Sequence, residues 1–136
     1  MLEGKRIIVT GSARGMGEAS LKAYVEAGAN VVGMDVSDEA GESVSNKANN
    51  AGPGKCSYIH VDVSKKSSVE ESFTKAVEIL GGLDVLAHPA AIQRASNASD
   101  VSVEDWDLMF SINVKGTMLT NQIAYKHMKK SGGGSI

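Results

Sequence analysis

The chain is poor in cysteine, proline and aromatic residues, and it has no long apolar run. Its only cysteine, Cys56, excludes a disulfide within the chain and indicates a buried thiol in a reducing compartment. Two prolines among 136 residues exclude a collagen-like chain, and 4% aromatic residues leave the core to Val, Ile, Leu, Ala and Met. No apolar segment approaches the roughly 18 residues of a membrane span, and no signal-peptide core follows the N-terminus, so we expect a cytoplasmic protein.

Charge of one sign is not in excess either. Fourteen Lys and Arg residues against sixteen Asp and Glu residues leave a formal net charge of -2. Since a protein that follows a phosphate backbone needs clustered cations, no nucleic acid is expected as a partner. We likewise predict no membrane partner and no metal site. A chain of this length, residues 1–136, is expected to form one domain that buries roughly two-thirds of its unfolded surface.

Short β-branched runs alternate with longer segments of helical period. Strands are predicted at residues 6–10, 31–35, 57–61 and 83–87, and helices at 16–27, 38–50, 67–80 and 102–130. This alternation is typical of an α/β protein with a parallel sheet and helices on both faces. Right-handed crossovers give the doubly wound sheet a strand order of 3-2-1-4, with Ser135 and Ile136 starting a fifth strand. Ligands of such sheets bind beyond the strands' carboxyl ends, where the order reverses.

Two capping signals mark helix starts. Ser67 with Glu70, and Ser102 with Asp105, have the spacing of capping boxes. The 102–130 helix carries apolar residues on nearly every side, so we expect both of its faces to be covered.

A glycine-rich turn, Thr10 to Gly17, joins the first predicted strand to the first helix. Gly11 permits a sharp turn, Gly15 lets the backbone approach a pyrophosphate, and Gly17 lets the helix press against the sheet. The free N–H groups and the dipole of the helix then favour an anion. The same glycines also fit a tight connection that binds nothing.

Asp35 favours the phosphate-binding interpretation over a mere tight connection, because it lies 24 residues after Gly11, at the end of the second predicted strand. An acidic side chain at about this offset accepts hydrogen bonds from a ribose diol. A solvated strand-end residue or a helix cap is the alternative. Since a carboxylate there would repel a 2′-phosphate, NAD is favoured over NADP. Arg14 points mildly the other way, because its guanidinium could pair with such a phosphate.

Four motifs follow one another along the chain. They are Thr10-Gly11-x-x-x-Gly15-x-Gly17, Asp62-Val63, Leu83-Asp84-Val85-Leu86 and Ile112-Asn113-Val114-x-Gly116-Thr117. Together they resemble the short-chain dehydrogenase/reductase family over all 136 residues. The resemblance implies a Rossmann-type fold and an NAD-dependent oxidoreductase that moves hydride between nicotinamide and a secondary alcohol or ketone.

The resemblance also implies roles for single residues. Asp62 and Val63 would contact the adenine, although a strand-end turn and ordinary core packing are the alternatives. Met16 would contact the nicotinamide or only fill the base of its helix. Asn113 would belong to the catalytic group, and the 103–130 helix would pack in the interface of a homo-oligomer.

The sequence departs from the family after the fourth predicted strand. Where the family usually carries Asn-Asn-Ala-Gly, this chain has His88-Pro89-Ala90-Ala91. Proline lacks an N–H, and a β-carbon at Ala91 restricts φ, so the backbone that lines the cofactor pocket can be displaced. His88 and Ala90 stay among the cofactor-binding candidates. For His88, at a strand end, a structural or exposed position is favoured over a catalytic role.

A second departure concerns catalysis. The family's Ser and Tyr-x-x-x-Lys follow the fifth strand, and the sequence stops at Ile136, so the chain is expected to be C-terminally truncated. Tyr125 and Lys129 match Tyr-x-x-x-Lys literally. They precede the fifth strand and begin only 12 residues after Asn113, so we interpret them as a solvated or interface face of the helix.

Three functions are compatible with these residues. The leading hypothesis is the cofactor half of an NAD-dependent oxidoreductase. The second is a dinucleotide-binding module without catalysis. A methyltransferase-like Rossmann domain is the third, and the spacing from Gly11 to Gly17 and the helix around Asn113 argue against it.

Overall fold

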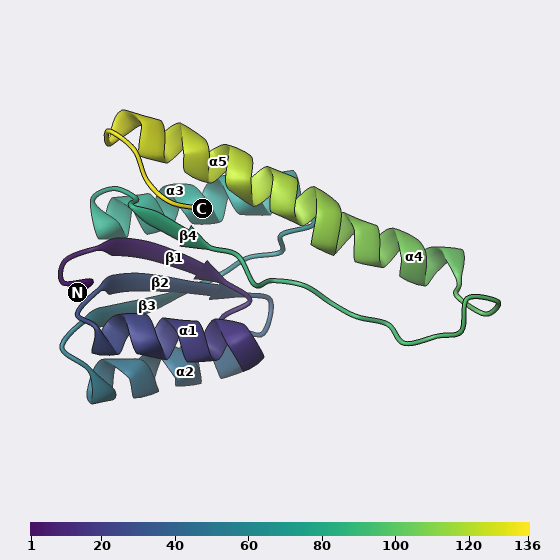
Figure 1. The fold of residues 1–136 in the computed structure, drawn as a ribbon, viewed down its shortest axis with the longest axis horizontal. Coiled ribbons are helices and arrows are strands. Elements are labelled where there is room, and N and C mark those ends of the chain that lie inside the picture. Colours follow the sequence, from purple (N-terminus) through teal and green to yellow (C-terminus); the bar gives the residue numbers. More distant parts are fainter.

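The β-branched runs form four parallel strands, and the segments between them form helices, in the computed structural model of residues 1–136 (Figure 1). The elements are β1 (Arg6–Thr10), α1 (Gly15–Glu26), β2 (Asn30–Asp35), α2 (Asp38–Ala51), β3 (Lys55–His60), α3 (Lys66–Leu80), β4 (Val85–Ala87), α4 (Val103–Met109), the π-helical segment η1 (Phe110–Gly116) and α5 (Thr117–Lys130). Each predicted strand and helix is present, with ends shifted by one or two residues.

The strand order is β3-β2-β1-β4, as predicted. Ile8 of β1 lies opposite Val32 of β2 on one side and Leu86 of β4 on the other. The chain therefore winds in one direction from β1 to β3 and crosses back to place β4 on the far side of β1. Beyond β4, Ser135 donates to the carbonyl of Asp84 at 2.9 Å and accepts from the N–H of Leu86 at 3.0 Å. This parallel bridge is the predicted start of a fifth strand.

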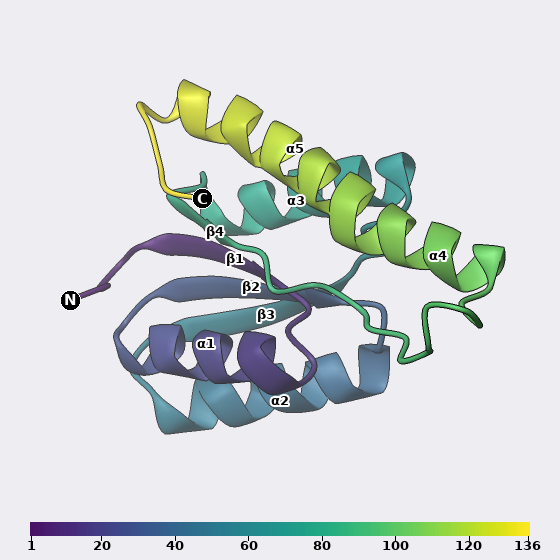
Figure 2. The same cartoon turned by 45° about the vertical axis from the view of Figure 1, so that its right-hand side comes forward.

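Two apolar layers hold the helices on the sheet. α1 and α2 cover one face, and α3 and α5 cover the other (Figure 2). Because side chains alternate along a strand, Ile7 and Val9 point into the first layer and Ile8 into the second. Each fully buried Ile, Val or Leu contributes about 1.5–3 kcal/mol. Phe73 is the one aromatic side chain among the buried residues of the two layers.

The start of α3 differs from the prediction. The capping box at Ser67 is wrong, because Lys65 occupies the N-cap position and makes no side-chain cap bond. The neighbouring Ser68 hydroxyl instead accepts from the backbone N–H of Asp62 at 2.9 Å, so this serine fixes the turn after β3. The cap at Ser102 is confirmed, since its hydroxyl accepts at 3.1 Å from the backbone N–H three residues later.

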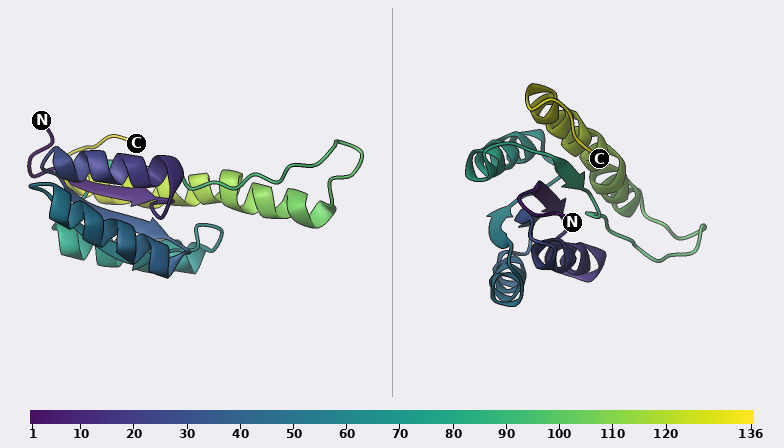
Figure 3. Two further views of the ribbon diagram at one scale, coloured as in Figure 1. Left: turned by 90° about the horizontal axis from the view of Figure 1, so that it is seen from below. Right: turned by 60° about the vertical axis from the view of Figure 1, so that its left-hand side comes forward.

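The long predicted helix is continuous through α4, η1 and α5, but its middle is π-helical. α4 and the loop before it project beyond the sheet as an arm (Figure 3). The expectation that both faces of this helix are covered is wrong for one flank. Four apolar side chains spaced four residues apart are about half exposed there: Trp106, Phe110, Val114 and Met118. None of the helices combines the length and the apolar composition that a membrane span requires.

An ion pair joins the starts of β1 and β4. The Arg6 guanidinium donates to the two carboxylate oxygens of Asp84 at 2.6 and 2.9 Å, and the backbone N–H of Arg6 donates to the same carboxylate at 2.9 Å. A third guanidinium N–H donates to the carbonyl of Gly81, at the end of α3. The hydrogen bond from Arg6 lowers the pKa of Asp84 to about 2, and partial burial opposes this shift. The pair therefore ties three elements together.

Replacing Asp84 by Asn should lower the free energy of unfolding by about 1–2 kcal/mol at neutral pH, because the charge-assisted bonds are lost. A carboxyl group whose pKa is lower in the folded than in the unfolded protein stabilises the fold at any pH above its unfolded-state pKa. That contribution is lost as the pH falls through the folded-state pKa. The difference between the two proteins in urea denaturation should therefore shrink from about pH 4 to about pH 2. Asp107→Asn, at an exposed position without an ion pair, is the control. An equal difference at both pH values would remove the ion pair as the cause.

Candidate functional site

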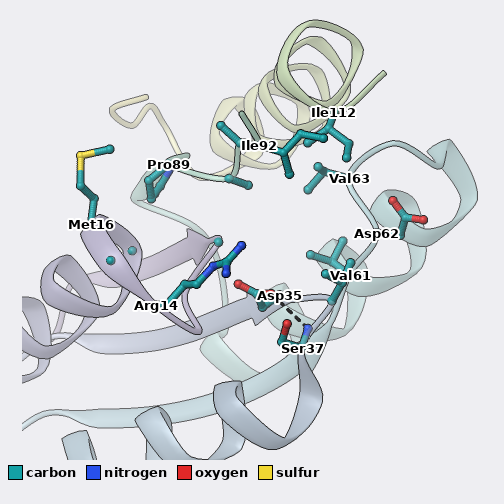
Figure 4. A pocket seen from close by; sticks show the side chains of 16 residues that line it. Arg14, Met16, Asp35, Ser37, Val61, Asp62, Val63, Pro89, Ile92 and Ile112 are labelled. Atoms are coloured by element: carbon teal, nitrogen blue, oxygen red, sulfur yellow. Dashed lines mark hydrogen bonds between the residues drawn. The ribbon is translucent and has the colours of Figure 1, made fainter. Parts of the chain in front are cut away.

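A cavity of about 350 Å³ opens at the carboxyl ends of the strands, between β1 and β4, where the strand order reverses. Five segments form its walls: the glycine turn, the end of β2, the residues after β3, the loop after β4, and Ile112 of η1 (Figure 4). It is lined by Gly11, Arg14, Gly15, Met16, Gly17, Asp35, Val36, Ser37, Val61, Asp62, Val63, Pro89, Ala90, Ala91, Ile92 and Ile112. Nine of the ten residues predicted to bind a cofactor lie among these, and the exception is His88.

The glycine turn meets the β4 loop at van der Waals distance. Gly11 has φ +61°, and a β-carbon there would stand 2.8 Å from the Cα of Ala90. A β-carbon on Gly17 would collide with the carbonyl of Gly11. These two approaches require glycine. Gly15 has φ +58° and open space where a β-carbon would be, so its backbone faces the cavity without obstruction.

Asp35 fixes the turn that it faces. One carboxylate oxygen accepts from the backbone N–H of Ala13 at 3.0 Å, and the other accepts from the N–H of Ser37 at 3.0 Å. The second bond helps to start α2, so part of the predicted helix-cap alternative is present. Since an ionised carboxylate has about four acceptor sites, two remain for a hydroxyl pair in the cavity.

Arg14 and Met16 occupy the mouth of the cavity. The Arg14 side chain is exposed and points toward the same part of the cavity as the Asp35 carboxylate (Figure 4). Arg14 makes no ion pair with any acidic side chain. Met16 is 77% exposed, so it does not fill the base of α1. Both side chains are free to contact a bound molecule.

Asp62 and Val63 line the opposite end, after β3. Burial acts to raise the pKa of Asp62, but hydrogen bonds from Ser64 and Lys65 outweigh it and lower the pKa. Its carboxylate is thus largely used within its own turn, including a 2.6 Å bond from the Ser64 hydroxyl. Val63 is buried against Gly116, where a β-carbon would stand 2.9 Å from a Val63 methyl. Val63 therefore packs in the core and also lines the cavity.

Asn113 does not line the cavity, yet it shapes one wall. Its side-chain carbonyl accepts from the N–H of Ile92 at 2.9 Å, and its amide donates to the carbonyl of Ile92 at 2.8 Å. The amide thereby pairs with the loop backbone as a strand would. It lies within η1, the π-helical part of the long helix. Asn113 thus holds Ile92 in the cavity wall.

His88 is turned into the protein rather than into the cavity. Its Nδ1 lies 2.6 Å from the Thr10 hydroxyl and 3.3 Å from the Thr120 hydroxyl. Its Nε2 is buried without a hydrogen-bond partner. Burial alone lowers the pKa of His88 below its usual value. The side chain therefore links β1, β4 and α5 beneath the cavity.

The apolar wall of the cavity was not predicted. Val61, Ile92 and Ile112 join Val63 there (Figure 4). In the sequence, Val61 has the pattern of an ordinary buried strand residue, and Ile92 lies in a loop without periodicity. The one available signal was the position of Ile112 beside Asn113 in a motif.

Tyr125 and Lys129 are remote from this geometry. Tyr125 is 61% exposed on α5, and neither residue lines the cavity. No tyrosine and only one basic residue, Arg14, are found among the lining residues. The arrangement offers backbone N–H groups at the start of α1, one acceptor at Asp35 and an apolar slot. Such a set can hold an elongated molecule with an anionic centre and a ribose.

Comparison with known proteins agrees with this geometry. The family model described as short chain dehydrogenase matches residues 5–136. The chain is 35% identical over 135 residues to a 3-alpha-(or 20-beta)-hydroxysteroid dehydrogenase of Mycobacterium tuberculosis. It is 33% identical over 135 residues to a 3-oxoacyl-[acyl-carrier-protein] reductase of Thermotoga maritima. Each match covers 99% of this chain, and it covers 50% of the first relative and 54% of the second.

A crystal structure of a short-chain type dehydrogenase/reductase from Mycobacterium marinum superimposes with a TM-score of 0.93 at 31% identity. The superposition covers 98% of this chain and 54% of the other. The chain thus spans about half the length of the relatives that it matches. The family typically binds a nicotinamide cofactor. With a family model over residues 5–136 and the family's fold around the cavity, the chain belongs to the short chain dehydrogenase family.

Proposed function

We propose that residues 1–136 form the cofactor-binding half of an NAD-dependent oxidoreductase acting on a secondary alcohol or ketone. One observation carries the proposal: the glycine turn, the Asp35 carboxylate, and Asp62 and Val63 after β3 all line a single cavity at the reversal of strand order. Ligands of doubly wound sheets bind at this place. The open backbone at Gly15 supplies the close approach that a pyrophosphate needs.

Each part of the cavity suits one part of a dinucleotide. The N–H groups around Gly15 at the start of α1 would hold the pyrophosphate, because that helix end is electropositive. Asp35 would accept from the adenine ribose, and Asp62 and Val63 would lie beside the adenine. Pro89 and Met16 lie toward the other end, where the nicotinamide would supply or accept hydride.

The preference for NAD rests on charge. A 2′-phosphate at the ribose would face the Asp35 carboxylate, whose position two backbone N–H groups already fix. Arg14 has no acidic partner and could attract such a phosphate. Its side chain is exposed, however, so solvent screens this attraction and ordering the side chain costs entropy. The fixed charge on the diol is expected to prevail.

The substrate class is inferred from the relatives. A hydroxysteroid dehydrogenase, a 3-oxoacyl reductase and a D-threitol dehydrogenase of Mycolicibacterium smegmatis are each named for a hydroxyl or carbonyl compound. This supports an alcohol or ketone of small-molecule size as the substrate.

A second function has one observation in its favour. No tyrosine or lysine lines the cavity, so it lacks the Tyr-Lys pair that the family uses for proton transfer, and its carboxylates, Asp35 and Asp62, already accept hydrogen bonds from neighbouring groups. The 136 residues by themselves would then bind a dinucleotide without turning over a substrate. An absorbance assay for NADH alongside a binding assay separates the two functions.

Replacing Asp35 by Ala should weaken NAD binding by about 1–3 kcal/mol, since a charged acceptor for the ribose is lost. The same change should leave NADP affinity unchanged or improved, because the repulsion of the 2′-phosphate disappears. Titration calorimetry with both nucleotides measures the two effects. Glu39→Ala, which removes an exposed charge from the first turn of α2, is the control.

Comparing the affinities for NAD and NADP separates the loss of the ribose contact from a purely structural effect of the substitution. If Asp35 only fixed the glycine turn through Ala13, the variant would lose affinity for NAD and NADP alike. Equal losses, or an unmodified chain that binds NADP more tightly than NAD, would contradict the assignment.

Asn113 is proposed as a catalytic-group residue of the whole protein that acts here by positioning the loop after β4. Asn113→Ala should speed exchange of the Ile92 amide hydrogen about tenfold or more, because both backbone bonds are lost. Asn113→Asp keeps the acceptor and loses the donor, so it should give a smaller increase. Native-state hydrogen exchange by NMR is the measurement. An unaltered Ile92 in Asn113→Ala would refute the positioning role.

A second copy of the chain is proposed as the partner of the half-exposed flank of α4, η1 and α5. Trp106 and Phe110 stack there with ring centroids 4.7 Å apart, although both are about half exposed. Phe110→Glu should shift a dimer or larger species to monomer in analytical ultracentrifugation, since a charge enters the apolar contact. Gln122→Glu, at an exposed polar position on α5, should leave the mass unchanged. A monomeric unmodified chain would reject this interface.

A further inference from the structure

His88 links the carboxyl ends of β1 and β4 through one partly buried side chain. Its Nδ1 lies 2.6 Å from the hydroxyl of Thr10, which is fully buried and has no other hydrogen-bond partner. Thr10 directly precedes Gly11, and His88 is separated from Ala90 only by Pro89. Since Gly11 and Ala90 meet in the cavity wall, the imidazole lies immediately behind that contact.

The hydrogen bonds around the ring pair either neutral tautomer better than a cation, because Nδ1 can accept from Thr10 or donate to the Thr10 and Thr120 hydroxyls, whereas Nε2 has no partner. The Thr120 hydroxyl lies 2.9 Å from the carbonyl of Gly116 and donates its proton there, so it can only accept from His88. The Thr10 hydroxyl has no acceptor except Nδ1. When Thr10 donates to Nδ1, the ring carries its proton on Nε2. A cation carries both protons, so it cannot accept from Thr10, keeps an Nε2–H without a partner and adds a charge to the partly buried ring.

No charged side chain around the ring would stabilise an imidazolium cation. β1 presents the Thr10 hydroxyl to the ring, α5 presents the Thr120 hydroxyl, and neither these elements nor β4 presents an acidic or basic side chain. Nε2 is buried without a partner. Burial accordingly lowers the pKa of His88, with no opposing charge. A charged ring is stabilised only where it can reach water, outside the space between β1 and α5.

We propose that His88 is a positioning residue for the cofactor cavity, which keeps Gly11 against Ala90 only while its imidazole is neutral and so makes dinucleotide affinity fall in acid. The ring itself is the bistable element. It lies between β1 and α5 when neutral and leaves that space when protonated. Its departure displaces Pro89 and Ala90 from the cavity wall. This inference rests on the proposed function, because the affinity in question is that for NAD.

Calorimetric titration of the chain with NAD at several values between about pH 5.5 and about pH 8 tests the inference. The dissociation constant should rise at least about threefold toward acid, since the binding-competent fraction falls as His88 takes up a proton. His88→Asn is neutral throughout and keeps an acceptor for Thr10. It should bind NAD with nearly the affinity of the unmodified chain at the upper pH and show no such rise.

The two other histidines provide matched controls. His60→Gln and His127→Gln should both retain the rise, because His60 pairs with Asp38, His127 lies half-buried late in α5, and neither lines the cavity. A rise that persists unchanged in His88→Asn would overturn the inference and leave the proposed function intact. Failure of the unmodified chain to bind NAD at the upper pH would instead contradict the proposed function.

An NMR titration of the imidazole supplies a readout that a purely structural histidine would not change. Because coupling between proton and cofactor is reciprocal, saturating NAD should lower the pKa of His88 further. His127 should titrate identically with and without NAD. A His88 titration that NAD leaves unaltered would also refute the inference.

Discussion

The contact between Gly11 and Ala90 is the constraint on which the site depends. β1 and β4 lie side by side in the sheet, and the chain leaves them on opposite courses, the first into α1 and the second toward the α4 arm. Their loops can meet directly above the strands only because Gly11 lacks a β-carbon. A side chain at Gly11 would push the loops apart and alter the cavity that they enclose.

Other interactions in the chain fix the two sides of this contact. On the glycine side, the Asp35 carboxylate holds the backbone of the turn through Ala13. On the β4 side, Asn113 pairs with both polar groups of Ile92, across a separation of 21 residues. The cavity is therefore formed in the free protein, which lowers the entropy that a ligand must lose on binding.

The strand order and layers were predictable because they depend on simple periodicities. Alternation at Ile7, Ile8 and Val9 divides the core into its two layers, and right-handed crossovers leave one order for four such strands. The glycine turn and Asp35 were predictable for a similar reason, since φ and a strand-end carboxylate are local properties. These residues form the polar side of the cavity.

What escaped prediction depends on contacts between distant segments. The spacing of Ser67 and Glu70 is that of a capping box, but the hydroxyl of Ser68 bonds the turn after β3, and α3 starts earlier. The pairing of Asn113 with Ile92 joins a helix to a loop that has no periodicity. His88 was placed with the cofactor candidates because it lies in the stretch that matches the family's Asn-Asn-Ala-Gly, and no sequence pattern indicates that its ring turns inward to Thr10.

The central claim is that this cavity holds a nicotinamide dinucleotide with its pyrophosphate at the start of α1. NMR titration of the ¹⁵N-labelled chain with NAD tests it most directly, since every backbone N–H reports its own surroundings. We predict the largest amide shifts at Gly15, Met16 and Gly17, with further shifts at Val63 and little change on α2. No saturable shift, or shifts confined to surfaces outside the cavity, would contradict the account.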